Sequence, residues 1–129
     1  MRSNINNHLP GSLHANIKMF KRVKNFLGVR PRVDLKKLLR SGAVVVDVRS
    51  VAEFGSGHRK GSLNIPLNLI PEQMDNLEKD KPIITCCASG MRSASARSLL
   101  LSNGFKEVYN AGKWSNLLKY MEDQNAMHL

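Results

Sequence analysis

Two adjacent cysteines are the residues of this sequence best suited to chemistry. Cys86 and Cys87 are the only cysteines among the 129 residues. Their Cα atoms are expected to lie about 3.8 Å apart across a trans peptide, which is less than the roughly 4.4–6.8 Å that a disulfide usually spans. They therefore cannot link distant segments, and the hypothesis is that at least one of the two thiols is present for its reactivity.

The segment that follows Cys86 has the pattern of an anion-binding loop. Residues 87–93 read Cys-Ala-Ser-Gly-Met-Arg-Ser and join an apolar run to a helical pattern. Backbone N–H groups of such a loop and of the helix start converge, and with the helix dipole they favour an anion, so we expect Cys87 to be a thiolate. Arg92 is expected to close the loop by contacting its backbone or a substrate anion. The expected anion-binding residues are Ala88, Ser89, Gly90, Met91, Arg92 and Ser93.

The elements that must position this loop alternate between β-type and helical patterns from residue 33 onward. Asp34 is a candidate helix N-cap, and Ser50 with Glu53 has the spacing of a capping box. The alternation predicts right-handed βαβ units in an open α/β sheet, with the ligand crevice outside the carboxyl ends of the strands. Strands are expected over residues 43–48, 62–67, 82–86 and 105–109, and helices over 34–40, 71–79, 93–103 and 113–122, with a short helix starting at residue 50.

The positive charge of the chain is concentrated at its start. The formal net charge is +10, and residues 1–32 contain seven basic residues and no acid. We predict two parts, a basic flexible N-terminal arm over 1–32 and a folded domain over 33–129. Residues 17–27 are partly amphipathic, which indicates a short helix or arm that packs on the domain, the alternative being a helix that binds a membrane surface or a partner.

Composition excludes several classes of protein. Aromatic residues make up 5% of the chain and no nucleic-acid-binding motif accompanies the charge, so no nucleic-acid partner is expected. The first 30 residues lack the 7–15-residue apolar run of a secretory signal, and no stretch approaches the roughly 18 apolar residues of a membrane span. A cytoplasmic protein is the simplest interpretation.

An ordered set of short motifs resembles the rhodanese family. The motifs are Asp47-Val-Arg49, Glu53-Phe54, Gly57-His58, Gly61-Ser62, Asn64-Ile65-Pro66, the 87–93 loop, and the strand and turn over 108–112. Over about residues 33–120 the chain is similar to the small single-domain bacterial members. The resemblance implies a rhodanese-like α/β fold, a five-stranded, mostly parallel sheet with helices on both faces.

The resemblance also implies a sulfurtransferase. Cys87 would attack the sulfane sulfur of thiosulfate or of a persulfide, become a persulfide, and pass the outer sulfur to a thiol, to cyanide or to a protein acceptor. This is thiol–disulfide exchange, which needs a nucleophilic, exposed thiolate. No metal or organic cofactor is expected.

Two other functions remain open beside sulfur transfer. Phosphatases and arsenate reductases with a catalytic cysteine have five residues between the cysteine and the arginine, whereas four residues separate Cys87 from Arg92. The shorter loop favours a pocket for one sulfur atom over a tetrahedral oxyanion. The second alternative is a non-catalytic rhodanese-like binding or regulatory module.

Two positions depart from the thiosulfate-processing members of the family. Those enzymes carry basic residues where this chain has Ser89 and Glu53, so positive charge is missing from the expected mouth of the site. Arg59, Lys60 and Lys113 are candidates to replace this missing positive charge. The alternative is that they are ordinary solvated surface charges.

The supporting residues are expected to act through structure. Asp47 and Arg49 end the strand beside the catalytic one, and hydrogen bonds and salt bridges that shape the site are favoured for them over direct chemistry. His58 has no second ligand at metal spacing and is interpreted as a turn residue. Cys86 is expected to point away from the loop and pack in the core, the alternative being a resolving thiol. Trp114 follows the last loop and is expected in the core, the alternative being a position at the mouth of the pocket.

Overall fold

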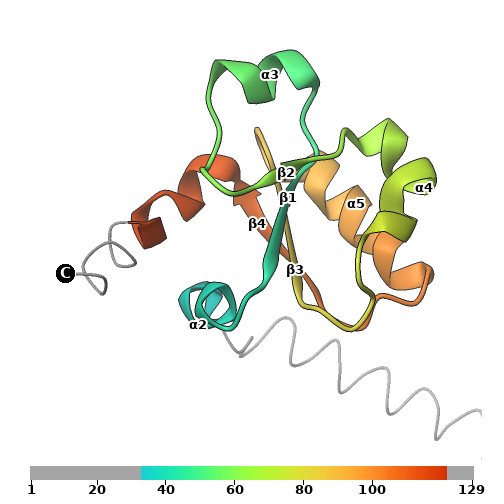
Figure 1. Ribbon diagram of the computed structural model, residues 1–129. Coiled ribbons are helices and arrows are strands. Elements are labelled where there is room, and N and C mark those ends of the chain that lie inside the picture. The colour runs from blue at the N-terminus through green and yellow to red at the C-terminus, as the bar shows by residue number, and fades with distance from the viewer. Residues whose placement is uncertain (1–32, 122–129) are drawn as a thin grey trace, which may run out of the picture. The chain divides into compact units, whose positions relative to one another are not determined.

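The computed structural model describes residues 33–121, and the predicted basic arm (1–32), including its amphipathic stretch, lies outside the described residues (Figure 1). The α-helices are α2 (Leu35–Arg40), α3 (Val51–Ser56), α4 (Ile70–Gln73) and α5 (Met91–Ser102). The strands are β1 (Val44–Asp47), β2 (Leu63–Asn64), β3 (Ile83–Cys87) and β4 (Val108–Lys113). Three 3₁₀ helices, η1 (Leu67–Leu69), η2 (Met74–Asn76) and η3 (Trp114–Leu117), connect them.

The strands form one parallel sheet in the order β2-β1-β3-β4. The prediction of five strands is wrong for the part of the chain described, which contains four. The reason lies in the sequence, because residues 33–121 contain only four β-type runs, and the fifth strand was implied by the family resemblance alone. The two central strands, β1 and β3, pair from Val44 with Ile83 to Asp47 with Cys86, so their carboxyl ends meet at one edge.

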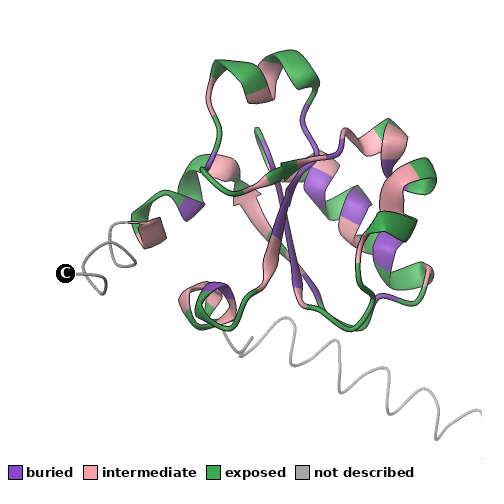
Figure 2. Ribbon diagram, viewed as in Figure 1, coloured by how far each residue is buried: buried purple, intermediate pink, exposed green. Residues whose placement is uncertain are grey.

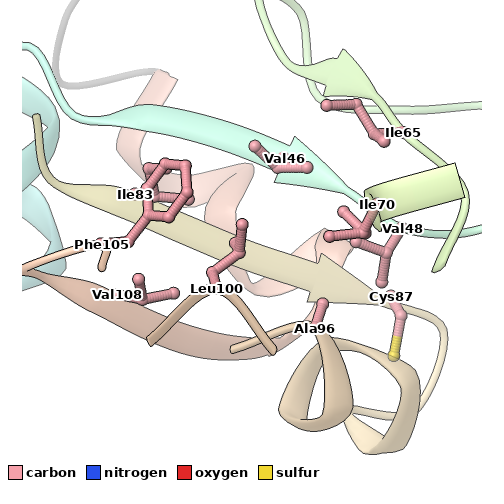
Figure 3. Packing of buried hydrophobic residues seen from close by; sticks show 10 residues of the cluster. All are labelled: Val46, Val48, Ile65, Ile70, Ile83, Cys87, Ala96, Leu100, Phe105 and Val108. Carbon is pink, nitrogen blue, oxygen red and sulfur yellow. The ribbon is translucent and has the colours of Figure 1, made fainter. Parts of the chain in front are cut away.

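Apolar residues cover both faces of the sheet, as expected for parallel strands packed between helices. On one face α4 and α5 enclose a core that includes Val46, Ile83 and Cys87 (Figure 3). On the other, α2 and η3 enclose a smaller core around Val45 and Cys86. Successive residues of a strand point to opposite faces, so the two neighbouring cysteines belong to different cores. Figure 2 shows that most of β1 and β3 is buried as a result.

The helix starts follow the predicted capping chemistry. The Asp34 carboxylate accepts a hydrogen bond from the Lys37 backbone N–H at 3.1 Å and caps α2. The predicted capping box of α3 is present, because Ser50 Oγ accepts from the Glu53 backbone N–H while Glu53 Oε1 accepts from the Ser50 backbone N–H, both at 3.2 Å. Glu53 is thereby fixed on the first turn of α3.

Several predicted boundaries are corrected. The helix expected over 71–79 is α4 followed by η2, and it ends where Leu77 adopts an extended conformation with ψ 145°. The strand expected over 62–67 is reduced to β2, since Pro66 is the N-cap residue of η1. The strand expected over 105–109 starts at Val108 and continues to Lys113, which pairs with Cys87. The helix expected over 113–122 begins as the 3₁₀ helix η3.

Candidate active site

Cys87 is the last residue of β3, and its sulfur lies against the N-terminal turn of α5. The strand thus extends one residue beyond the expected 82–86. The Cys87 side chain is 0% exposed, which contrasts with the exposed thiolate that the reaction was expected to need. Ala88, Ser89 and Met91 are exposed, Met91 to 78%, so the loop around the sulfur is the part of the site that solvent reaches.

Hydrogen-bond donors surround the sulfur of Cys87. The Gly90 backbone N–H donates to Sγ at 2.9 Å, and the Ser93 hydroxyl lies 3.3 Å from it. Burial by itself would raise the pKa of this thiol. The Ser93 hydroxyl and the backbone N–H groups of Ser93, Gly90 and Ser89 outweigh burial and lower the pKa of Cys87 from 9.0 to about 7. The site therefore favours a thiolate near neutral pH.

The helix that supplies these donors begins earlier than expected, at Met91 instead of residue 93. Gly90 is its N-cap, with φ 100° and no side chain to cap the first turn, so N–H groups of the turn are available to the sulfur. Glycine is required here for two reasons. The positive φ strains any other residue, and a Cβ at Gly90 would lie 3.2 Å from the Cα of Gly112. Met91, Arg92 and Ser93 thus belong to the first turn of α5.

Asn110 on β4 ties the loop to the sheet, and the sequence analysis missed it as a site residue. Its Nδ2 donates to the Gly90 carbonyl at 3.0 Å, and its Oδ1 accepts from the Gly112 backbone N–H at 2.9 Å. Its Oδ1 also lies 2.7 Å from the Ser93 hydroxyl. That hydroxyl has one hydrogen and two acceptors in reach, Asn110 Oδ1 and Cys87 Sγ, so it donates to one at a time.

An irregularity of the last strand pair brings Asn110 to this place. Thr85 pairs with Asn110 and Cys87 with Lys113, so three steps along β4 match two along β3. Such a bulge redirects side chains near a sheet edge. The only signal in the sequence was an amide residue two positions before a glycine, at the end of the last expected strand.

Arg92 forms a bidentate ion pair with Glu53. Its Nη1 lies 2.7 Å from Oε1 and its Nη2 lies 3.0 Å from Oε2, which joins α5 to α3 across the mouth of the site. Arg92, followed by the Ser50 backbone N–H, lowers the pKa of Glu53 from 4.5 to about 2. The partner of the guanidinium is therefore a carboxylate on another helix, whereas a contact with the loop backbone or a substrate anion was expected.

Asp47 and Arg49 form a buried ion pair at the end of β1. Arg49 Nε lies 3.0 Å from Asp47 Oδ1 and Nη2 lies 2.8 Å from Oδ2. The same guanidinium donates to the carbonyls of Glu53 at 3.2 Å and Gly57 at 2.7 Å, and its carbon lies 4.7 Å from the centroid of the Trp114 ring. These contacts hold the segment that carries Glu53, in line with the structural interpretation of the pair.

His58 contacts the end of α3. Its Nδ1 lies 2.8 Å from the Phe54 carbonyl, and its ring stacks on the Phe54 ring at 3.7 Å between centroids. Residues 33–121 contain no group of three or more His, Cys, Asp or Glu side chains placed to hold a metal ion. His58 lies in the irregular segment between α3 and β2, and its role as a turn residue stays a prediction.

Cys86 has the opposite environment to Cys87. Its side chain is 0% exposed in the core beside α2 and η3, away from the loop. Burial raises the pKa of its thiol to about 12, and the nearby Asp47 carboxylate adds to the effect. Cys86 therefore stays protonated and unreactive near neutral pH.

The three candidate compensating cations are placed differently from one another. Lys60 and Lys113 are exposed, while Arg59 is 6% exposed. Arg59 Nη1 donates to the Lys60 carbonyl at 3.3 Å, and its Nε has no hydrogen-bond partner. Desolvation by burial lowers the pKa of Arg59. Arg59 is thus a buried cation and not a surface charge.

Comparison with known proteins assigns the family. Residues 32–113 match the sequence model of the rhodanese-like domain family. The chain is 36% identical over 81 residues to the uncharacterized protein YqhL of Bacillus subtilis, a match that covers 60% of this chain and 64% of that protein. It is 32% identical over 88 residues to the thiosulfate sulfurtransferase GlpE of Stutzerimonas stutzeri, covering 68% of this chain and 81% of that enzyme. Among solved structures, the human single-domain sulfurtransferase TSTD1 superposes with a TM-score of 0.59 at 28% identity, covering 67% of this chain and 90% of that one.

The chain belongs to the rhodanese-like family. Its resemblance to small proteins named as sulfurtransferases further identifies it as a rhodanese-type enzyme. Among residues 33–121, no helix is long and apolar enough to cross a membrane.

Proposed function

We propose that this protein transfers sulfane sulfur through a persulfide on Cys87. The observation that carries the proposal is the set of donors on the Cys87 sulfur, with the Gly90 N–H at 2.9 Å and the Ser93 hydroxyl at 3.3 Å. These donors stabilise an anionic sulfur at the edge of a parallel sheet, where open α/β folds bind their ligands.

The reaction is two successive displacements at sulfur. The Cys87 thiolate attacks the outer sulfur of a donor R–S–SH, a new S–S bond forms, and the old one breaks with its electron pair leaving on R–S⁻. With thiosulfate the leaving group is sulfite. An acceptor thiolate then attacks the outer sulfur of the Cys87 persulfide, takes it, and regenerates the Cys87 thiolate, so no external oxidant or reductant is consumed.

The proposed site residues divide by role. Cys87 is the catalytic residue, and the first turn of α5 with the loop before it supplies donors to the anion. Gly90 provides the conformation of the loop, and Ser93 donates a hydrogen bond to the sulfur. Asp47, Arg49, Glu53 and His58 are positioning residues, because their contacts join β1, α3 and α5 around the loop.

Thiol reactivity distinguishes the enzyme from a binding module. A thiol with a pKa near 7 is substantially ionised at neutral pH and reacts quickly with alkylating agents, whereas a buried thiol held in an apolar site does not. The donors on Cys87 therefore favour an enzyme. Slow alkylation of Cys87 at pH 7 would favour the module.

The decisive experiment is intact-mass analysis after incubation with a sulfur donor. The wild-type protein, treated separately with thiosulfate and with glutathione persulfide, is expected to gain the mass of one sulfur atom, mapped to Cys87. Cys86→Ser should retain most of the labelling and of the turnover, and Cys87→Ser should lose both. Labelling on Cys86 of the wild type would overturn the assignment.

The proposal also covers the partners of the protein and its location in the cell. A small sulfur-donor anion or persulfide and a thiol, cyanide or protein acceptor are the proposed partners, with no nucleic acid among them. A contact of the basic arm with a membrane surface is the less favoured alternative. Fractionation of cells that express the full chain tests the proposed cytoplasmic location, and recovery in the membrane fraction would contradict it.

A further inference from the structure

The mouth of the Cys87 site contains a cation whose charge is already balanced. Arg92 lies in the first turn of α5, five positions after Cys87, and both of its terminal nitrogens contact the two carboxylate oxygens of Glu53, at 2.7 and 3.0 Å. The two side chains are 38% and 37% exposed, so the pair lies at the surface of the site. Arg92 directly precedes Ser93, whose hydroxyl lies 3.3 Å from the Cys87 sulfur, so the guanidinium belongs to the helical turn that contacts the reacting atom.

The rest of the loop adds no positive charge. Ala88, Ser89, Gly90 and Met91 are neutral, and the second ion pair near the sheet edge, Asp47 with Arg49, is balanced as well. Lys113, the register partner of Cys87 on β4, is an exposed cation outside this loop. On the α3–α5 side of the site, a donor that approaches the Cys87 thiolate meets an arginine whose charge Glu53 cancels.

The charge of the donor then decides how well it binds. Thiosulfate is a dianion, and an organic persulfide or a thiosulfonate carries one negative charge on its reacting end. Because the Coulomb energy is proportional to the charge of the donor, the Glu53 carboxylate opposes thiosulfate about twice as strongly as it opposes a single charge at the same place. The bidentate contact also withholds the guanidinium fork of Arg92 from the sulfonate oxygens of thiosulfate.

We propose that Glu53 determines the donor specificity of this site, by occupying Arg92 and cancelling its charge so that singly charged sulfane donors, organic persulfides above all, are preferred to thiosulfate. This inference rests on the proposed function and narrows its donor class. Glu53 touches neither the donor nor Cys87, so it is a positioning residue that acts through Arg92.

The test compares two donors that differ in charge but react by the same step. Methanethiosulfonate gives up its outer sulfur to Cys87 and leaves as methanesulfinate, while thiosulfate leaves as sulfite. In both, the thiolate attacks the outer sulfur and the leaving group takes the electrons of the broken S–S bond. The second-order rate of Cys87 persulfide formation is measured for each donor at about pH 8.5, where the thiol is ionised in every variant.

Glu53→Gln removes the charge and keeps an oxygen that can cap α3. We expect the rate with thiosulfate to rise about tenfold and the rate with methanethiosulfonate to rise about threefold. The Coulomb energy is proportional to the charge of the donor, so the logarithm of the rate increase should be twice as large for the dianion as for the monoanion. Intrinsic differences between the donors cancel, because each is compared with itself. Salt should reduce both gains, the thiosulfate gain more strongly.

Two further variants isolate the cause. Glu78→Gln removes an exposed carboxylate that precedes β3, at the opposite end of that strand from Cys87, and should leave both rates within about twofold of wild type, as expected for a screened distant charge. The double variant Glu53→Gln/Arg92→Gln restores a neutral pair and should return the ratio of the two rates to the wild-type value. Melting temperatures confirm that each variant is folded.

Three results would overturn the inference. They are equal gains for the two donors in Glu53→Gln, no gain with thiosulfate, or a gain that persists in the double variant. In each of these cases the proposed function stands, because the wild type still forms the persulfide. Failure of both donors and of glutathione persulfide to load sulfur on wild-type Cys87 would instead overturn the proposed function, and this inference with it.

Discussion

Replacing Ser93 by alanine should raise the pKa of the Cys87 thiol without disturbing the fold. The substitution removes the hydroxyl that lies 3.3 Å from Sγ and leaves the Gly90 N–H at 2.9 Å in place. Among the groups that lower the pKa of Cys87, the Ser93 hydroxyl has the largest effect. Ser93 is fully buried on α5, and alanine fits its position with a higher helix propensity.

The size of the effect follows from the strength of one hydrogen bond to a charged acceptor. Such a bond contributes about 1.5–3 kcal/mol, and one pKa unit corresponds to about 1.4 kcal/mol. The lower end applies here, because the hydroxyl satisfies Asn110 Oδ1 when the thiol is protonated, so part of the bond energy is recovered. We expect a rise of about one unit, from about 7 to about 8. The thiolate fraction at pH 7 then falls from about one half to about one tenth.

The assay is the rate of iodoacetamide alkylation as a function of pH, in a Cys86→Ser background. Wild-type reactivity should rise through pH 7 and level off above it, because the thiolate is the reactive form and a lowered pKa places its titration there. Ser93→Ala should be about fivefold slower at pH 7 and close to wild type near pH 9.5. Ser98→Ala, an exposed serine on the same helix, is the matched control. An unchanged profile for Ser93→Ala would refute the assignment of the Ser93 hydroxyl as a thiolate donor.

The other predictions concern specificity, stability and the arm. Because four residues separate Cys87 from Arg92, the wild type should not hydrolyse an aryl phosphate, and turnover that disappears in Cys87→Ser would show the loop-length argument to be wrong. Arg59→Met should raise the free energy of unfolding by about 1–2 kcal/mol in urea titration, because it removes a buried cation whose Nε has no partner; a loss of similar size would contradict this. Deleting residues 1–28 should leave the sulfur transfer rate near the wild-type value, and a collapse of turnover at an unchanged melting temperature would place the arm in the active site.

Local sequence signals predicted the parts of the fold that local interactions determine. The caps at Asp34 and Ser50 depend on residues three positions apart, and both are present. The buried strands β1 and β3 were predicted within one or two residues, because continuous apolar runs of this length indicate strands covered on both faces. The order of Cys87, the small loop residues and the helix was also readable in advance.

Contacts between distant segments were not predictable in the same way. The ion pair of Glu53 with Arg92 and the hydrogen bonds of Asn110 to the loop join residues far apart in the chain, and no local pattern encodes such pairings. The bulge in β4 depends on the register of two strands. The burial of Arg59 depends on how the loop before β2 packs, whereas its composition alone suggested a surface charge.

The placement of the two cysteines on opposite faces of β3 has a consequence for the lifetime of the sulfur that Cys87 would carry. A persulfide beside a second reactive thiol is discharged at once, because the neighbour attacks, releases hydrogen sulfide and leaves a disulfide. Cys86 is the only other cysteine of the chain, yet it points into the opposite core and has a pKa of about 12. Because the side chains of β3 alternate between its two faces, the Cys86 thiol cannot attack a persulfide on Cys87. Under the proposed function, the loaded protein should keep its sulfur until an external thiol arrives, and so act as a store as well as a conduit.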